Sequence, residues 1–231
     1  MLSHESQTGL TLSPITTLPL TTMIIPTTNA TAVETPKPMP APKTLEPKPL
    51  IPPLHFGVIN SNLYRGSHPR SHNYRFLRRL RLSTIVSLTP QPPSEELHEF
   101  ARQQGINVVW LECGSHNGKS KKKRGVAITS ENIVAALSVL LRQSSSPAYV
   151  HCMNGTDVVV VLVACLRRLQ FWSMASIASE AGTYGGELSV KDQIFVEKFN
   201  ARREVRANLK EGDMVKWLWK GMSKEVIEGL E

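Results

Sequence analysis

The sequence predicts a three-layer α/β fold, in which a small, mainly parallel sheet carries helices on both faces. Two observations support this prediction. A strand-like run at 83–88, a helix-like run at 95–104 and a second strand-like run at 106–111 follow one another, an order typical of parallel βαβ units. A further strand, loop and helix follow one another within 148–170, where Val, Leu and Ala dominate from Val158 onward.

Capping residues predict where the helices begin and end. Ser94 precedes two glutamates and a helical run that Gly105 should stop, because Ser favours the N-cap and Gly the C-terminal exit. Thr129 or Ser130 should cap the next helix in the same way, and Ser173 a later one. The other expected elements are helices at 73–82, 130–143, 173–182 and 190–199 and short strands at 56–59 and 63–64.

The chain divides into three parts by composition. Residues 1–51 form a Thr/Pro-rich tail, which should be disordered and whose Pro-rich part a partner could dock as polyproline II. Residues 52–203 should form the folded domain. Residues 204–231 form a polar extension with an amphipathic piece at 214–230 that could be helical. We expect this piece to pack on the domain or stay disordered, in preference to docking a membrane surface, because its charges are mixed.

Composition limits the class of protein. The 231 residues are 41% hydrophobic, enough for one ordinary domain with extensions. Cys113, Cys152 and Cys165 lie far apart without zinc spacing, so we expect no metal site and no cofactor. No secretory signal is evident, and no run of about 18 apolar residues predicts a membrane span. We therefore expect reduced thiols and a cytoplasmic location, with the nucleus as an alternative.

The loop between the strand and the helix of 148–170 is the candidate site. It runs from His151 to Asp157, with Cys152 at its start and Gly155 within it. A strand, a tight loop and a helix N-terminus in this order form an anion cradle, because backbone N–H groups and the helix dipole both favour negative charge. The sequence therefore predicts a site for a phosphoryl-type anion beside Cys152.

This arrangement resembles the cysteine-dependent tyrosine and dual-specificity phosphatases, whose loop reads His-Cys, five residues, Arg. Within them the chain resembles the plant and fungal atypical dual-specificity phosphatases, and most of all the fungal oxidant-induced cell-cycle-arrest branch with a His-Cys-x-Asn-Gly loop. The strings that carry the resemblance are Pro53-Leu54-His55-Phe56, Leu63-Tyr64-Arg65-Gly66-Ser67-His68-Pro69, Ser87-Leu88-Thr89-Pro90, Gly105-Ile106, His151-Cys152, and Trp172-Ser173 followed by Ile177 and Glu180.

The resemblance implies a cysteine-phosphatase fold with Cys152 at the nucleophile position. It also implies a phosphate loop made of His151, Met153, Asn154, Gly155, Thr156, Asp157 and Val158. Active relatives hydrolyse phosphotyrosine-type esters or inositol pyrophosphates, with a loop like His-Cys-x-Arg-Gly-Lys-His-Arg-Thr-Gly. This chain keeps His151, Cys152 and Gly155. At the other positions it has Asn154, Thr156, Asp157, Val158, Val159 and Val160 in place of Arg, Lys, His, Arg, Thr and Gly.

These departures weaken the catalytic interpretation. Val158 cannot clamp a phosphoryl group, and Asp157 places negative charge where an anion and a Cys152 thiolate would lie. The loop at 112–125, where active members supply or position an acid, contains Glu112 and then only basic residues. The first hypothesis is therefore a pseudophosphatase that binds or scaffolds related family proteins. The alternative is a weak cysteine-dependent phosphatase acting on phosphotyrosine or inositol pyrophosphates.

A basic cluster follows in the same loop, comprising Lys119, Lys121, Lys122, Lys123 and Arg124. It is either a solvated loop, a site that attracts a polyanion such as an inositol polyphosphate or a phosphoprotein, or a nuclear import signal. Arg65 and Arg70 could reinforce the second of these. The net charge of +8 permits anionic partners without naming one, and we do not expect nucleic acid to be the main ligand.

Overall fold

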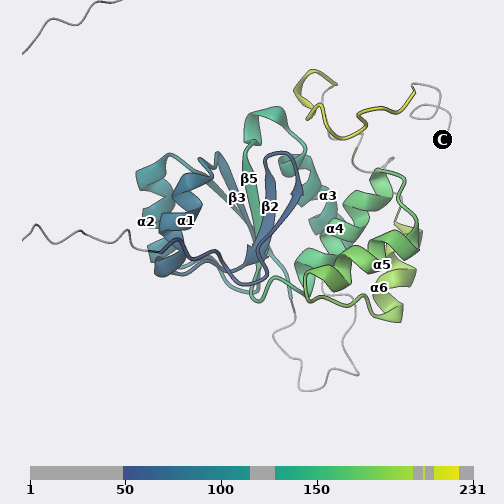
Figure 1. The fold of residues 1–231 in the computed structure, drawn as a ribbon, viewed down its shortest axis with the longest axis horizontal. Helices are drawn as coiled ribbons and strands as arrows, with labels where there is room; N and C mark the ends of the chain where they lie inside the picture. Colours follow the sequence, from purple (N-terminus) through teal and green to yellow (C-terminus); the bar gives the residue numbers. More distant parts are fainter. Residues whose placement is uncertain (1–48, 115–127, 200–204, 206–210, 224–231) are drawn as a thin grey trace, which may run out of the picture. The chain divides into compact units, whose positions relative to one another are not determined.

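A computed structural model describes residues 49–114, 128–199, 205 and 211–223 (Figure 1). The predicted tail up to residue 48, the basic cluster at 119–124 and residues 224–231 lie outside the described residues. The described chain forms a five-stranded sheet in the order β1-β2-β5-β3-β4. Its strands are β1 (Gly57–Asn60), β2 (Leu63–Ser67), β3 (Thr84–Thr89), β4 (Asn107–Glu112) and β5 (Ala148–Cys152). Only β1 pairs antiparallel with its neighbour, and the remaining pairs are parallel.

Helices cover both faces of this sheet, as the sequence predicts. Figure 1 shows α1 (Ser71–Arg79) and α2 (Glu95–Gln104) together on one side of the strands. On the other side lie α3 (Ser130–Leu140), α4 (Val158–Leu169), α5 (Met174–Thr183) and α6 (Val190–Lys198). The prediction of a three-layer α/β fold with a mainly parallel sheet is confirmed.

The capping signals explain most helix boundaries. The Ser94 hydroxyl accepts a hydrogen bond from the Leu97 N–H at 3.4 Å, and Gly105 ends α2 in the left-handed conformation at φ 66°. The first helix begins at Ser71, two residues before the predicted start. There the Asn73 side chain accepts from the Arg70 N–H at 2.9 Å, so Asn73 lies inside the first turn and closes it.

Two hydrophobic clusters hold the layers together. Leu77, Leu97 and Phe100 of α1 and α2 pack with Ile85 on one face of the sheet. Side chains alternate along a strand, so Val86, the next residue of β3, belongs to the larger cluster on the opposite face. That second cluster includes every residue of α4 from Val158 to Leu166, each buried. Burial on all sides explains why α4 is apolar from Val158 to Leu166.

The C-terminal segment packs on the domain but does not form the expected helix where it is described. Met214 pairs with Arg142 in a single β-bridge, and the Val215 N–H donates to the Leu141 carbonyl at 2.9 Å. Turns follow at 216–221, with Leu218 only 2% exposed. The Trp219 indole donates to the Leu169 carbonyl at 3.2 Å. The segment therefore supplies hydrogen-bond donors to the Leu141 and Leu169 carbonyls, at the ends of α3 and α4. Carbonyls at a helix end have no partner within their own helix, and a continuous helix at 214–230 would not supply these donors.

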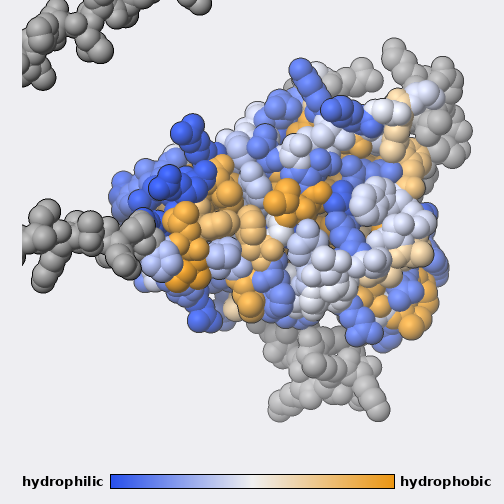
Figure 2. All heavy atoms as spheres, in the orientation of Figure 1, coloured by the Kyte–Doolittle hydropathy of each residue, from blue (hydrophilic) through white to orange (hydrophobic). Residues whose placement is uncertain are grey.

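The surface of the described residues mixes polar and apolar side chains, with apolar ones gathered in several small patches on the face drawn in Figure 2. Leu54 and Met153 are the most exposed large apolar residues near the Cys152 loop, at 65% and 61%. Across the described ranges, no helix is both long enough and apolar enough to cross a membrane.

Candidate functional site

Cys152 lies at the carboxyl end of the central strand, where parallel α/β sheets usually bind ligands. It is the last residue of β5 and pairs in register with Ser67 of β2. The loop that follows leads into α4 at Val158, as predicted. The thiol is 1% exposed, so the sulfur lies at the bottom of the loop and not on the surface.

A buried arginine fixes the loop from outside. The Arg65 Nη2 group, on β2, donates to the Gly155 carbonyl at 2.9 Å. The carbonyl and the next N–H of one peptide group point in opposite directions, so this bond directs the Thr156 N–H toward the loop interior. Arg65 is 1% exposed, and its guanidinium stacks over the Tyr184 ring at 4.8 Å. Burial lowers the pKa of this guanidinium, while Glu180 opposes the effect.

Two histidines bind the carbonyls of the two preceding peptide groups, His55 through its ring and His68 through its backbone N–H. The His55 Nδ1–H donates to the Asn154 carbonyl at 2.8 Å, and the His68 backbone N–H donates to the Met153 carbonyl at 3.3 Å. The N–H of the peptide that His55 holds belongs to Gly155, and it points inward to the Cys152 sulfur at 3.2 Å. Successive carbonyls of the loop therefore face outward, which is the backbone arrangement of an anion cradle.

The side chain of Asn154, an exposed residue, accepts hydrogen bonds from N–H groups of this cradle. Its Oδ1 accepts hydrogen bonds from the Thr156 N–H at 3.2 Å and the Asp157 N–H at 3.4 Å. The Cys152 thiol also donates to the same oxygen, at 3.5 Å. The Nδ2 group donates to Asp157 Oδ2 at 2.9 Å, which orients the amide with its oxygen inward. A neutral side-chain oxygen thus takes the donors that an anion would use.

Gly155 allows the loop to lie against β2. Its φ is +81°, and a Cβ built on it would come within 2.8 Å of the Gly66 carbonyl carbon and the Ser67 nitrogen. Only glycine accepts both this conformation and this approach without strain. The sequence singles out Gly155 as the loop glycine, but its contact with Gly66 appears only in the structure.

His151 supports the strand and does not face a ligand. It is fully buried, and its Nε2 lies 2.7 Å from the Ser87 hydroxyl on β3. Burial and, to a lesser extent, the neighbouring His68 lower the pKa of His151 to about 3, so the ring is neutral at physiological pH. The two imidazole rings are 5.1 Å apart. His151 therefore links β5 to β3 directly behind the loop.

The groups that catalysis would need are absent or displaced at the described positions. Val158, at the arginine position, is 6% exposed and packs in the core. Asp157 accepts from the Thr156 hydroxyl at 3.3 Å as well as from the Asn154 amide. The Glu112 carbonyl at the end of β4 accepts from the Asn132 side chain at 2.7 Å. Burial raises the pKa of the next residue, Cys113, to about 11, so this thiol stays protonated.

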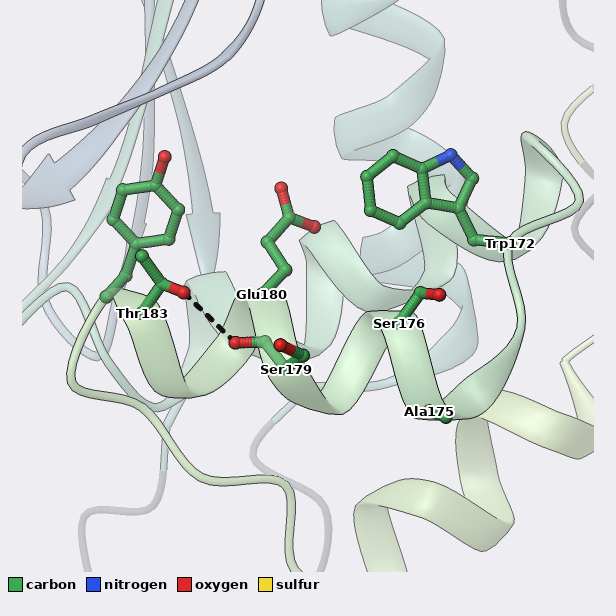
Figure 3. Close-up of a pocket in the computed structure, with 7 residues that line it drawn as sticks. Trp172, Ala175, Ser176, Ser179, Glu180 and Thr183 are labelled. Carbon is green, nitrogen blue, oxygen red and sulfur yellow. Dashed lines mark hydrogen bonds between the residues drawn. The ribbon is translucent and has the colours of Figure 1, made fainter.

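A shallow groove of about 570 Å³ lies along α5, and Tyr184, over which the Arg65 guanidinium stacks, is among its lining residues (Figure 3). Trp172 also lines this groove, and Figure 3 shows the Ser176, Ser179 and Thr183 side chains along the helix. Behind it, Arg167 pairs with Glu180 and stacks over the Trp172 ring at 4.4 Å. The groove contains no sequence-predicted site residue. Across the described ranges, no three His, Cys, Asp or Glu side chains are placed to hold a metal ion.

Comparison with known proteins gives the family. A model of the tyrosine phosphatase family matches residues 50–219, which include the whole described sheet and the Cys152 loop. The chain belongs to the tyrosine phosphatase family. It is 35% identical to the "Putative tyrosine-protein phosphatase OCA6" of Saccharomyces cerevisiae, over 73% of this chain and 79% of that protein. It is 33% identical to the inositol diphosphatase DSP2 of Arabidopsis thaliana, over 65% and 70% of the two chains.

A solved structure of this family supports the fold. The core catalytic domain of the PP-IP phosphatase SIW14 from S. cerevisiae, crystallised with citrate, superposes with a TM-score of 0.61 at 28% identity. The match covers 69% of this chain and 93% of that domain. The predicted cysteine-phosphatase fold and the predicted membership among the atypical dual-specificity phosphatases are therefore confirmed.

Sequence reasoning found the loop but not the groups that hold it. His55 and Arg65 lie 99 and 90 positions from the loop residues whose carbonyls they bind. Arg65 is suggested by the sequence only as a source of positive charge for a ligand, whereas the structure uses it to orient a peptide group. Asn154 is predicted only as a loop member at a position where relatives have arginine. Its side chain accepts from the N–H groups two and three positions on, a local pattern that asparagine commonly forms in turns.

Proposed function

We propose that this chain is a catalytically degraded phosphatase that acts as a binding or scaffold subunit. The observation that carries the proposal is the occupation of the loop by Asn154, whose side-chain oxygen accepts from the Thr156 and Asp157 N–H groups. A substrate phosphoryl group would have to displace this oxygen before it could reach the sulfur. It would then lie beside the Asp157 carboxylate with no arginine to offset the charge.

The expected loss of rate is large. A phosphoryl-stabilising arginine contributes roughly 10³ to 10⁵ in rate, and Val158 replaces the residue with the comparable role. Losing a general acid costs roughly 10² to 10⁴ more. These factors do not simply multiply, because catalytic groups act as a unit. Together they predict turnover that is orders of magnitude below that of an intact phosphatase.

We further propose that the partners are related phosphatase-family proteins in one complex, in the cytoplasm or, through the basic cluster, in the nucleus. The retained fold supports this proposal, because a chain that has lost its catalytic groups still keeps two packed hydrophobic clusters and an ordered loop. No disulfide joins Cys113, Cys152 and Cys165, which is compatible with a reducing compartment. A phosphorylated or polyphosphate ligand of the basic cluster fits the charge of +8 but has no described geometry.

One observation favours the alternative, a weak cysteine-dependent phosphatase for phosphotyrosine or inositol pyrophosphates. The Gly155 N–H donates to the Cys152 sulfur at 3.2 Å, and a loop held in this way could still support a nucleophile. The relatives named as inositol diphosphatases give this alternative its substrate class.

Two measurements test the proposal. Wild type should hydrolyse an aryl phosphate no faster than Cys152→Ser, because the arginine and the acid are both missing. Cys152-dependent turnover would overturn the pseudophosphatase assignment. Separately, the tagged full-length chain should co-purify with family paralogues at a fixed stoichiometry. Recovery of the chain without any paralogue would contradict the scaffold role.

A further inference from the structure

We propose that the outward face of α1 is a docking surface for an acidic segment of a partner protein, bound by arginine side chains and by two apolar residues beside the start of the helix. This inference rests on the proposed binding or scaffold function, for which it names the surface and the chemistry of the partner. It does not involve the Cys152 loop.

The charge of α1 has one sign. The stretch 70–82 contains five arginines and no acidic residue. The five, which we call the α1 arginine stripe, are Arg70, Arg75, Arg78, Arg79 and Arg81. The stripe and the basic cluster at 119–124 together carry more positive charge than the net charge of +8, so the remainder of the chain is slightly acidic. By contrast, α2 carries both signs and pairs Arg102 with Glu99.

The stability of the helix does not explain the whole stripe. A cation is favourable in the last turn of a helix, where Arg78 and Arg79 lie, but unfavourable at the N-terminus, where Arg70 is the N-cap. These three arginines are exposed, and none of them forms an ion pair with a carboxylate of the described residues. The core uses the opposite face of the helix, where Leu77 is fully buried. Their guanidinium groups are therefore available to a partner.

Two apolar side chains adjoin the stripe. Leu50 and Ile51 are 45% and 43% exposed. The Asn73 amide donates to the Ile51 carbonyl at 3.2 Å and to the Pro52 carbonyl at 3.0 Å, which holds this segment against the first turn of α1. On the side of the molecule that carries α1 and α2, Figure 2 shows hydrophilic side chains next to an apolar patch. Apolar residues surrounded by polar and charged ones are the usual composition of a protein–protein interface.

The shape of the stripe favours a peptide segment over other anions. The stripe lies on the convex side of one helix, whereas small ligands bind in concave sites. It is about 16 Å long at the rise of an α-helix, which is the length of a short peptide segment. Carboxylates suit this surface, because a guanidinium group binds a carboxylate through two parallel hydrogen bonds.

A neighbouring glutamate limits the width of the surface. Burial and, after it, the charge of Glu96 raise the pKa of the Tyr74 hydroxyl, so a carboxylate of α2 lies beside α1. A wide anionic surface such as a bilayer would meet this carboxylate as well as the arginines. A single acidic segment can follow the stripe without that repulsion.

The experiment measures fluorescence anisotropy of a labelled peptide, in which two leucines precede alternating glutamate and serine, with the full-length chain. We compare wild type with two double variants. Arg78→Gln with Arg79→Gln removes charge from the stripe, and Leu50→Ser with Ile51→Ser removes the apolar contact. Glutamine and arginine have similar helix propensities, so the arginine variant should fold.

The matched control is Arg102→Gln with Arg142→Gln, which removes the same charge at exposed arginines outside α1. Wild type and this control should bind alike, with an affinity that falls as salt is raised. The α1 arginine variant should bind at least about fivefold more weakly at low salt and show a smaller salt dependence. The leucine and isoleucine variant should also bind more weakly, with the salt dependence of wild type.

Three results would overturn the inference. One is wild type that does not bind the peptide, and another is an α1 arginine variant that binds it as tightly as the control. The third is binding of phosphatidylserine vesicles or of RNA that is tighter than peptide binding at physiological salt and depends on the same arginines.

The outcome is separable from that of the proposed function. Co-purification of family paralogues with the α1 arginine variant at the wild-type stoichiometry would overturn α1 as the docking surface and leave the scaffold function intact. Peptide binding by a chain that recovers no paralogue would support the docking surface and contradict the proposed family partners.

Discussion

Gly155 lies so close to Gly66 that a Cβ on Gly155 would approach the Gly66 carbonyl carbon to 2.8 Å. This contact joins the loop after β5 to the neighbouring strand β2, and it places the loop where Arg65 can reach the Gly155 carbonyl. The position of the cradle relative to Cys152 therefore depends on the absence of a side chain at Gly155.

Gly155→Ala should destabilise the protein by about 3 kcal/mol, because the substitution combines a positive φ with a backbone clash. Urea unfolding at pH 7 measures the free energy of unfolding. Gly182→Ala is the matched control, since a Cβ on this helical glycine meets nothing within 4 Å. The control should be neutral or stabilise by up to about 1 kcal/mol. Equal effects of the two substitutions would show that the close approach does not exist.

The ion pair between Arg167 and Glu180 should contribute strongly to stability. The two side chains are only 6% and 15% exposed, and Arg167 also donates to the Ile59 carbonyl at 2.7 Å. Arg167→Met leaves a largely buried carboxylate without its partner and should cost about 3 to 5 kcal/mol. Arg102→Met, at a pair that is 76% and 44% exposed, should cost less than about 1 kcal/mol. A similar loss at both sites would contradict the role of burial.

The neutral His151 should make stability fall in mild acid. Its folded pKa is about 3 against an ordinary 6.5, so between these values the unfolded chain binds a proton that the folded chain does not. The free energy of unfolding should therefore fall as pH falls from 6.5 toward 3, by about 1.4 kcal/mol per pH unit from this group. The pKa of His68 is also lowered by burial, which acts with the same sign.

Denaturant unfolding at pH 7, 6 and 5 measures this slope. His151→Gln should show a smaller decrease than wild type over the same interval, because the carboxylates that also titrate are common to both proteins. An unchanged slope in a folded His151→Gln variant would mean that His151 already accepts a proton in the native state.

Restoring arginine alone should not restore catalysis. Val158→Arg replaces a residue that is 6% exposed, and the guanidinium would pair with the adjacent Asp157 instead of a substrate. The expected turnover of an aryl phosphate is that of the Cys152→Ser background. Turnover that the single substitution raises by 10³ or more would show that Asn154 does not obstruct the loop.

A complete graft should behave differently. It combines Asn154→Arg, Thr156→Lys, Asp157→His, Val158→Arg, Val159→Thr and Val160→Gly. This set removes the internal oxygen and the carboxylate together and rebuilds the clamp. The graft should bind vanadate and show Cys152-dependent turnover, measured against the same graft carrying Cys152→Ser. A folded graft that binds no anion would mean that the backbone held by His55 and Arg65 is not a phosphate cradle.

The sequence by itself determined the order of strands and helices, the caps at Ser94 and Gly105, and the place of the Cys152 loop. These follow from local signals, namely hydrophobic periodicity and capping residues, whose effect extends over a few neighbouring positions. It also determined that Val158 stands where relatives have arginine, because a motif is read position by position.

Only the tertiary structure decided which side chains bind the carbonyl groups of the Cys152 loop. Arg65 and His55 reach the loop from 90 and 99 positions away, and no local pattern records such a contact. The Asn154 side chain, by contrast, bonds within the loop itself, to the Asp157 carboxylate and to the N–H groups two and three positions on. At 214–221 the chain forms a bridge and turns, and not an amphipathic helix, because groups of this segment bond to carbonyls at the ends of α3 and α4. At the Arg65 and His55 contacts and at 214–221, a distant partner, whose position depends on the whole fold, outweighed the local preference of the chain.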